Sequence, residues 1–345
     1  MNDLRLNVAL LRKRVPNLTA AAKAAGIRPA TVSNLCTGKI DLGKAEVKTL
    51  VGLASLANCK VDELIIRGEK MKMIETKIKT LDFFAPLVKG GTTGIVARPG
   101  MGQLVIVAEL LHRFKEIDTE TIFLAPETTR PELEETIELA DHITQSIEET
   151  VHKVKQYGEK SFLITDKEYI DNGKLFELQE ELGGMDVTTL LVDLSGNVVD
   201  DDFPFGPLET LWQLDADLAA RHQYPALSPL HSASSLLEDT ELDERHFLLR
   251  QRTRKILRRY RELRSIVQSH GIERLPQSEH DIYNKGERLE AYFTQPLYVA
   301  EELTSQKGES VSLDQTLSDI EAILNGQADR LEITELQFIG ALKGA

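Results

Sequence analysis

A strand, a glycine-bearing turn and an amphipathic helix follow one another between residues 93 and 114, and this stretch constrains the fold most. Residues 93–97 read TGIVA and predict a short buried strand. The residues after the turn place apolar side chains at helical spacing as far as Phe114. This layout predicts an α/β domain, in which ligands bind at the carboxyl ends of the strands.

The turn has the frame of a phosphate-binding loop without its charges. Such a loop reads G-x-x-x-x-G-K-[ST], in which the lysine neutralises phosphate charge and the hydroxyl binds magnesium. Residues 97–104 read ARPGMGQL, so Gly100 and Gly102 remain while Gln103 and Leu104 replace the lysine and the hydroxyl. Arg98 is the residue of the turn that could partly replace the lost cation. We therefore predict a degenerate P-loop that holds no metal and does not hydrolyse ATP at a meaningful rate, and weak binding of a phosphorylated ligand stays open.

The residues around this turn resemble those of a known family. Residues 74–91, IETKIKTLDFFAPLVKGG, are similar to the entry of the nucleotide-binding domain in the β subunit of the rotary ATP synthase. Four later segments agree with that family in its order: 126–139, 224–234, 293–304 and 312–340. The resemblance covers residues 74–345 and implies a RecA-like, mostly parallel α/β sheet followed by a C-terminal helical bundle.

The resemblance also assigns roles to two carboxylates. Glu127 falls on the position of the family's general base, and Asp193 is placed like the acidic residue that supports magnesium. Each has a structural alternative, because a carboxylate is stabilised at a helix start and aspartate is common at strand ends. Without the lysine, we interpret both as remnants of a catalytic site.

A base-binding site is implied by two aromatic residues. Tyr224, in the segment YPAL, matches the family's adenine-stacking position. The family's second aromatic position falls on Leu297, and the aromatic residue here is the next one, Tyr298. ATP, ADP or another phosphorylated compound is therefore the expected ligand, in an imperfect site.

The first 66 residues predict a different kind of domain. Residues 1–70 carry 12 Lys and Arg against 6 Asp and Glu, whereas the remaining residues carry 29 against 49. Helices are expected at 2–14, 19–26 and 29–38, with two more up to residue 66, and the spacing around Gly26 resembles the helix-turn-helix of the Cro/repressor-like family. The side chains expected to contact DNA are Thr19, Arg28, Thr31, Ser33, Asn34 and Lys39. The alternative is a helical module that binds another protein.

The expected domain order is a helix-turn-helix domain at 1–66, a linker at 67–75, a RecA-like domain at 76–230 and a helical domain at 231–345. A long helix at 241–270 has nine basic residues and one acidic residue between 245 and 264. Two explanations stay open for this helix: its charges pair with the acidic body, or they form a second surface for a polyanion.

The sequence leads first to the hypothesis of a DNA-binding transcriptional regulator, in which the ATP-synthase-like domain serves oligomerisation or ligand sensing. The alternatives are an active, nucleic-acid-coupled ATPase of the Rho or ATP synthase type, and an assembly protein with a protein-binding module. Double-stranded DNA and further copies of the chain are the expected partners. No stretch predicts a membrane helix, and Cys36 and Cys59 fit a reducing cytoplasm.

Overall fold

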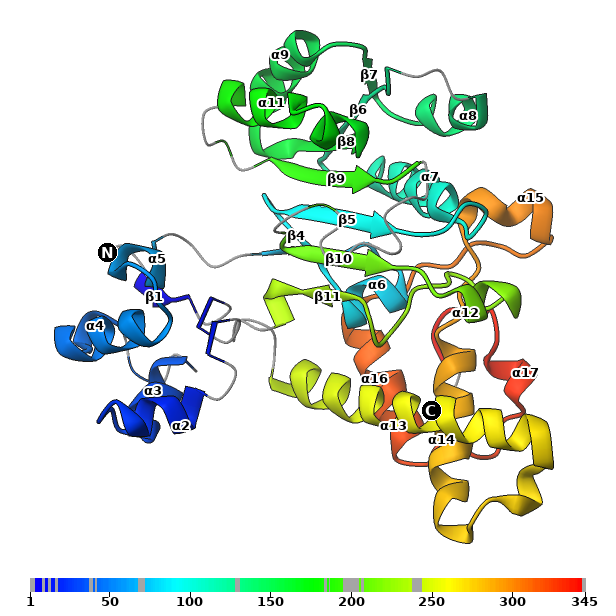
Figure 1. Ribbon diagram of the computed structural model, residues 1–345. Coiled ribbons are helices and arrows are strands. Elements are labelled where there is room, and N and C mark those ends of the chain that lie inside the picture. The colour runs from blue at the N-terminus through cyan, green and yellow to red at the C-terminus, as the bar shows by residue number, and fades with distance from the viewer. Residues whose placement is uncertain are drawn as a thin grey trace. The chain divides into compact units, whose positions relative to one another are not determined.

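The structure is a computed structural model that describes residues 4–7, 10–11, 14–15, 18–36, 40, 42–67, 72–127, 131–182, 185, 187–194, 205, 208–237 and 244–342. The chain forms two compact units (Figure 1). The N-terminal unit contains residues 1–72 and 235–244, and the main unit contains residues 73–234 and 245–345. The predicted domain boundaries stay predictions.

The N-terminal unit is mostly helical, with α2 (Leu18–Ala24), α3 (Pro29–Cys36), η1 (Leu42–Lys44), α4 (Val47–Leu56) and α5 (Val61–Leu64). Gly26 has a φ of +74° between α2 and α3, a conformation that favours glycine in so short a turn. The buried side chains of Leu11, Ala22, Leu53 and Leu64 belong to one apolar core. The two helices α2 and α3 thus follow the predicted spacing.

The prediction of a helix from residue 2 to 14, and of an all-α unit, is wrong. β1 (Leu4–Leu6) is a strand that pairs antiparallel with β2 (Ile65–Arg67). The Asn7 side chain accepts a hydrogen bond from the Leu10 amide at 3.0 Å, so helical turns begin only after Asn7.

The main unit is built on a seven-stranded sheet with the order β11-β10-β5-β9-β8-β6-β7. All neighbouring strands in it are parallel except the edge pair of β10 and β11. The strands are β5 (Thr92–Val96), β6 (Glu120–Leu124), β7 (His142–Thr144), β8 (Ser161–Asp166), β9 (Thr188–Val192), β10 (Thr210–Gln213) and β11 (Ala233–Ser234). The mostly parallel α/β sheet is therefore confirmed.

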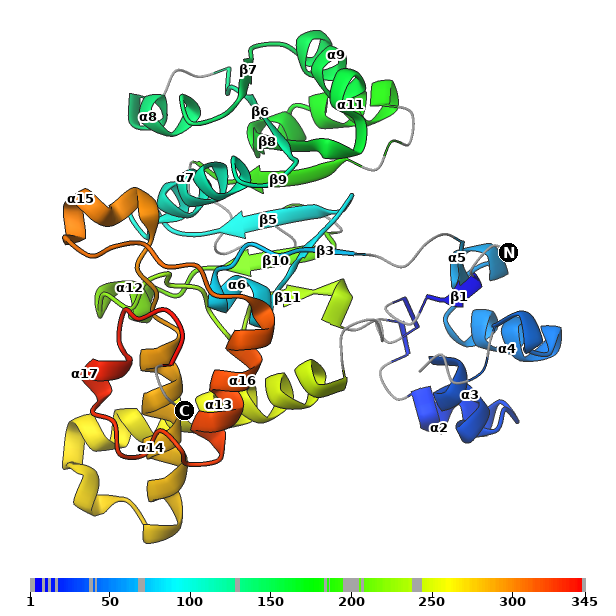
Figure 2. The same cartoon turned by 180° about the vertical axis from the view of Figure 1, so that it is seen from behind.

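Strand residues alternate between two apolar cores, one on each face of the sheet. Ile95 belongs to the core under α7 (Gln103–Phe114), and its neighbour Val96 belongs to the core under α9 (Ile147–Tyr157) and α11 (Lys174–Leu182). Figure 2 shows the same layers from behind. Burial on both faces explains why these strands read as continuous apolar runs.

A third apolar core holds the C-terminal helices together. It joins α6 (Lys79–Phe84), α13 (Glu244–His270), α14 (Gln277–Tyr292) and α16 (Leu313–Leu324), and it includes Phe83, Phe84 and Tyr292. The remaining elements are β3 (Met73–Ile74), β4 (Leu87–Val88), η2 (Pro131–Leu133), α8 (Glu134–Ile137), η3 (Gly158–Lys160), α10 (Glu168–Asp171), α12 (Ala216–Ala220), η5 (Ser235–Leu237), η6 (Ile272–Arg274), η7 (Tyr298–Ala300), α15 (Glu301–Thr304) and α17 (Ile333–Leu336).

Close packing of α13 against α14 predicts an unusual effect of one substitution. A Cβ atom at Gly286 would lie 2.3 Å from the Cβ of Tyr260, which cannot move away without its backbone. We expect Gly286→Ala to lower the free energy of unfolding by about 1–3 kcal/mol, although alanine is normally the better helix former. Urea unfolding followed by the fluorescence of the single tryptophan, Trp212, measures this in the main unit.

The matched control is Asn284→Ala, on the exposed side of the same helix. Helix propensity alone should leave this variant as stable as the parent or slightly more stable. If both variants gain stability, α13 and α14 do not pack as described.

Candidate functional site

The turn between β5 and α7 is tight and closed by its own backbone. The Met101 amide donates to the Arg98 carbonyl oxygen at 3.3 Å, and the Arg98 amide lies 3.3 Å from the Met101 sulfur. Gly100 and Gly102 have φ values of +82° and +94°. Both angles are in the left-handed region, so these glycines are required by the turn's geometry.

The residues that replace the expected lysine and hydroxyl lie in the first turn of α7. Gln103 is the first residue of the helix and is buried, and Leu104 is half-buried. Arg98 is exposed, one residue before Pro99. The helix therefore presents its amino end to the turn without a lysine or a metal-binding hydroxyl.

A cavity of about 580 Å³ opens beside this turn, a volume typical of small-molecule sites. Its walls come from the turn, from the first part of α7, from residues 222–226 and from residues 295–306 together with Phe338. Among the described residues that line it, none is Asp, Glu, Lys or Arg. The lining residues are Gly100, Met101, Gly102, Val105, Ile106, His222, Tyr224, Pro225, Ala226, Gln295, Pro296, Leu297, Ala300, Leu303, Thr304, Gln306 and Phe338.

Of the two predicted aromatic residues, the structure brings only Tyr224 to the cavity. The Tyr224 ring faces the turn, with its Cε1 atom 3.7 Å from where a Cβ of Gly102 would lie. Tyr298 lies in η7, where its ring stacks on His112 with centroids 5.2 Å apart and lies 5.1 Å from the Arg113 guanidinium. Leu303 and Phe338 line the cavity instead and were missed, because a single chain segment gives no sign of which distant segment it meets.

The predicted carboxylates lie at the carboxyl edge of the sheet. Asp193 follows β9 and is buried, and the neighbouring strand β8 ends at Asp166, whose side chain accepts hydrogen bonds from the Glu168 and Leu194 amides. Glu127 is exposed and forms an ion pair with Lys174, and this hydrogen bond raises the pKa of Lys174. In the described part of the chain, no group of three or more His, Cys, Asp or Glu side chains is arranged to hold a metal ion.

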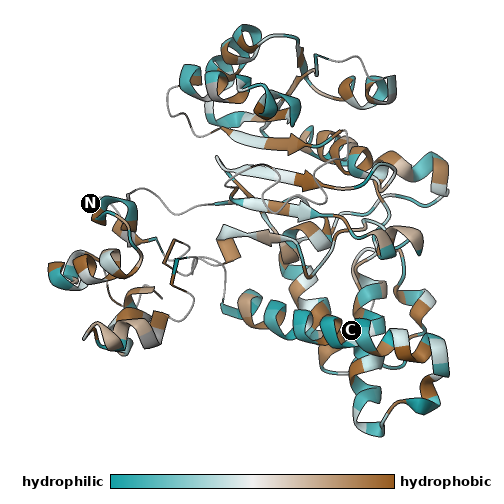
Figure 3. Ribbon diagram, in the orientation of Figure 1, coloured by the Kyte–Doolittle hydropathy of each residue, from teal (hydrophilic) through white to brown (hydrophobic). Residues whose placement is uncertain are grey.

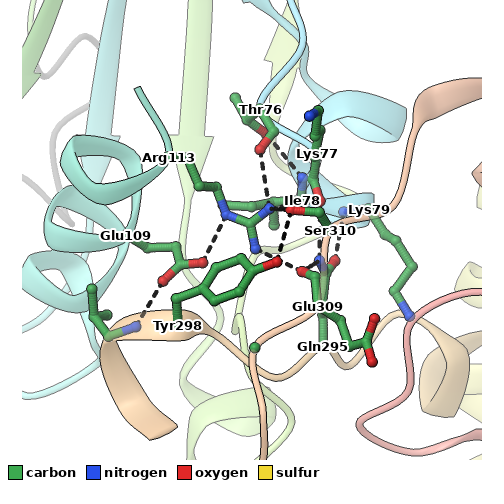
Figure 4. A network of polar contacts seen from close by, with 12 residues as sticks. Thr76, Lys77, Ile78, Lys79, Glu109, Arg113, Gln295, Tyr298, Glu309 and Ser310 are labelled. Carbon is green, nitrogen blue, oxygen red and sulfur yellow. Dashed lines mark hydrogen bonds and ion pairs between the residues drawn. The ribbon is translucent and has the colours of Figure 1, made fainter. Parts of the chain in front are cut away.

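A buried ion pair fixes the helix that carries the cavity wall (Figure 4). The Arg113 guanidinium donates to the Glu109 carboxylate at 2.7 Å, to the Glu309 carbonyl oxygen at 2.8 Å and to the Ser310 hydroxyl at 2.9 Å. The other Glu109 oxygen accepts the Val299 amide at 3.1 Å. The pair therefore joins α7 to the segment that forms the far wall of the cavity.

Two further charged groups are buried beneath this network. Lys79 donates to the Tyr292 and Ile339 carbonyl oxygens at 2.5 and 2.9 Å, and burial lowers the pKa of Lys79 to about 7. Burial raises the pKa of Asp82 to about 7, against the hydrogen bonds that it accepts from Thr76 and Lys77. Both groups tie the stretch before β4 into the core, so they serve the structure of the site.

The basic residues of α13, which is hydrophilic along much of its length (Figure 3), mostly contact the main unit. Arg259 pairs with Glu279 at 2.7 Å, and Arg264 pairs with Asp217 at 2.6 Å. These contacts favour pairing with the acidic body over a second surface for a polyanion. The basic residues with such contacts include Arg245, Arg252, Arg254, Arg259, Arg261 and Arg264.

The residues predicted to contact DNA lie along α2 and α3 or outside the described part. Arg28 is exposed just before α3, and Thr31 and Asn34 are half-buried within it. Thr19 lies in α2 and Ser33 in α3. Lys39 lies outside the described residues. No described helix is both long and apolar enough to cross a membrane.

The parallel sheet, the glycine turn after β5 and the helix that follows define the main unit as a P-loop type of α/β domain in its fold. ATP synthase subunit beta 1 from Pseudoalteromonas atlantica is 27% identical over 336 residues, which cover 81% of this chain and 62% of that protein. Subunit beta 2 from Syntrophotalea carbinolica is also 27% identical and covers 81% of this chain. Among solved structures, the ATP synthase subunit NeqB from Nanoarcheaum equitans matches with a TM-score of 0.57 at 17% identity, covering 75% of this chain and 77% of its own.

The main unit is therefore ATP-synthase-β-like. No protein-family model matches the chain, and the chain spans about three fifths of the length of the Pseudoalteromonas subunit. These relatives overturn the first hypothesis drawn from the sequence, a DNA-binding transcriptional regulator, because they are ATP synthase subunits. That hypothesis depended on the net charge and helical spacing of a small module, which are not specific to DNA binding.

The contacts of Arg113 generate a prediction about stability. Arg113→Met leaves the Glu109 carboxylate buried without its cation, and removing one partner of a buried pair typically costs about 3–5 kcal/mol. We expect a loss of this size in urea unfolding followed by Trp212 fluorescence. The double variant Glu109→Gln with Arg113→Met should lose less, because no unpaired charge remains.

The control for this loss is Arg274→Met, which changes an exposed arginine in η6. It should change the free energy of unfolding by less than about 0.5 kcal/mol. Equal losses in Arg113→Met and the control would contradict the assigned role of the pair.

Proposed function

We propose that the main unit is an ATP-synthase-related subunit that binds an adenine nucleotide in the cavity beside the turn of residues 97–102. The observation that carries the proposal is the position of Tyr224, whose ring faces Gly102 at the cavity wall. A flat base can stack on this ring while the rest of the ligand extends toward the amino end of α7.

The apolar residues of the cavity wall support a base as the bound group. Ile106, Leu297 and Phe338 give apolar contact, and Pro225 lines the same cavity as Tyr224. Aromatic stacking is tolerant of the exact base, so the adenine assignment comes from the ATP-synthase-like relatives and not from the cavity alone.

We also propose that the main unit assembles with other subunits of its kind. The relatives in the comparisons are named as subunits of ATP synthase, and a chain that shares their fold is expected to share faces suited to neighbouring subunits. This would place the cavity within an assembly, whether the neighbours are copies of this chain or related chains.

Base stacking on Tyr224 predicts the effect of removing the ring. Tyr224→Leu should weaken binding of an adenine nucleotide by roughly tenfold, because loss of one base–aromatic stack costs about 1–3 kcal/mol. Isothermal titration calorimetry with the full chain measures this. The matched control is Tyr157→Leu in α9, whose ring stacks on His142 outside the cavity. Equal weakening in both variants, or none in Tyr224→Leu, would refute the proposed site.

The residues of the turn predict whether the bound nucleotide is hydrolysed. Phosphoryl transfer depends on neutralising phosphate charge, and Gln103 and Leu104 supply neither a cation nor a metal ligand. We expect no measurable phosphate release from ATP with magnesium. Wild-type turnover that disappears in Glu127→Gln would show an intact catalytic site and support the nucleic-acid-coupled ATPase alternative. The variant Gln103→Lys with Leu104→Thr tests whether the missing groups alone limit the reaction.

A further inference from the structure

We propose that the cavity binds its ligand through the aromatic base alone, without a metal ion and without a gain in affinity from added phosphates. The inference rests on the proposed function and specifies its ligand class: adenosine and its mono-, di- and triphosphates should bind alike. A P-loop domain with a lysine and a magnesium site would instead favour the triphosphate.

The described residues that line the cavity offer no strong partner for charge. None of them is Lys, Arg, Asp or Glu, and their polar groups are mostly occupied by the protein itself. Gln295 accepts the Lys79 amide and donates to the Lys77 and Glu309 carbonyl oxygens. The Thr304 hydroxyl donates to Ala300. What remains is apolar and aromatic surface, which suits a flat, uncharged heterocycle.

The turn has only weak attraction for phosphate. Backbone amides and the amino end of α7 favour an anion, but this attraction is modest where solvent reaches it. The position that would hold a lysine has the amide of Gln103, and Leu104 has no oxygen for a metal ion. Pro99 also has no N–H to donate. Arg98 is the remaining cation of the turn, and its side chain is exposed.

Two carboxylates lie beside the turn. Val192 pairs with Ile95 in the register of β9 and β5, so Asp193 comes level with Val96 where the turn begins. Asp166 pairs with Val192 from the other side, which brings a second buried carboxylate to the same edge. Carboxylates do not attract phosphate groups, so Asp166 and Asp193 add no favourable charge for a polyphosphate chain.

The test is a series of calorimetric titrations of the full chain with adenosine, AMP, ADP and ATP, each with magnesium and with EDTA. We expect the four dissociation constants to agree within about threefold, and EDTA to leave them unchanged. The variant Gln103→Lys with Leu104→Thr should bind ATP at least tenfold more tightly than adenosine when magnesium is present. This preference should disappear in EDTA. Circular dichroism checks that this variant is folded, and the wild-type series decides the question without it.

The outcomes separate the inference from the proposed function. If wild-type protein binds MgATP but not adenosine, the inference is overturned and the proposed nucleotide site stands. If ATP binds more tightly than adenosine and Arg98→Ala removes the difference, Arg98 replaces the lysine and the inference is again overturned. If none of the four compounds binds, both fail. Equal binding that Tyr224→Leu weakens equally for all four compounds supports both.

Discussion

The Arg113–Glu109 pair holds together the parts of the chain on which the cavity depends. Arg113 lies near the end of α7, yet it bonds to residues 76–77 on one side and to residues 309–310 on the other. A buried guanidinium is tolerated only where such partners satisfy it. Because the first part of the same helix forms a cavity wall, the pair fixes the distance between the glycine turn and the segment after Gln295.

Most of the main fold could be predicted because burial leaves a local trace in the sequence. The strand predicted at 93–97 is β5 at Thr92–Val96, and the helix predicted after the turn ends at Phe114 as expected, since each shows its apolar pattern within a few residues. The strand Leu4–Leu6 gave no such trace, because three residues become a strand only through a partner about 60 positions away. Propensity cannot indicate a pairing of that range.

The candidate site was predictable only in part, for a similar reason. The glycine turn and Tyr224 are encoded in short, distinctive segments. Leu303 and Phe338 reach the same cavity from segments that carry no sign of ligand binding. Tyr298 shows the limit of positional reasoning: one residue beyond Leu297, its ring lies against His112 and Arg113 while Leu297 faces the cavity.

Charge was the least reliable basis for prediction, because a sequence gives the net charge and only the fold shows which charged groups pair. The sequence left two explanations open for the arginines of α13, and the structure favours pairing, since Arg259, Arg261 and Arg264 are held by carboxylates of the main unit. The turn shows the converse. Its backbone frame is that of a phosphate site, but Gln103 and Leu104 stand where the lysine and the metal-binding hydroxyl would be. The side chains on a P-loop frame therefore decide what it can bind, and here the described residues that line the cavity offer mainly apolar and aromatic contact.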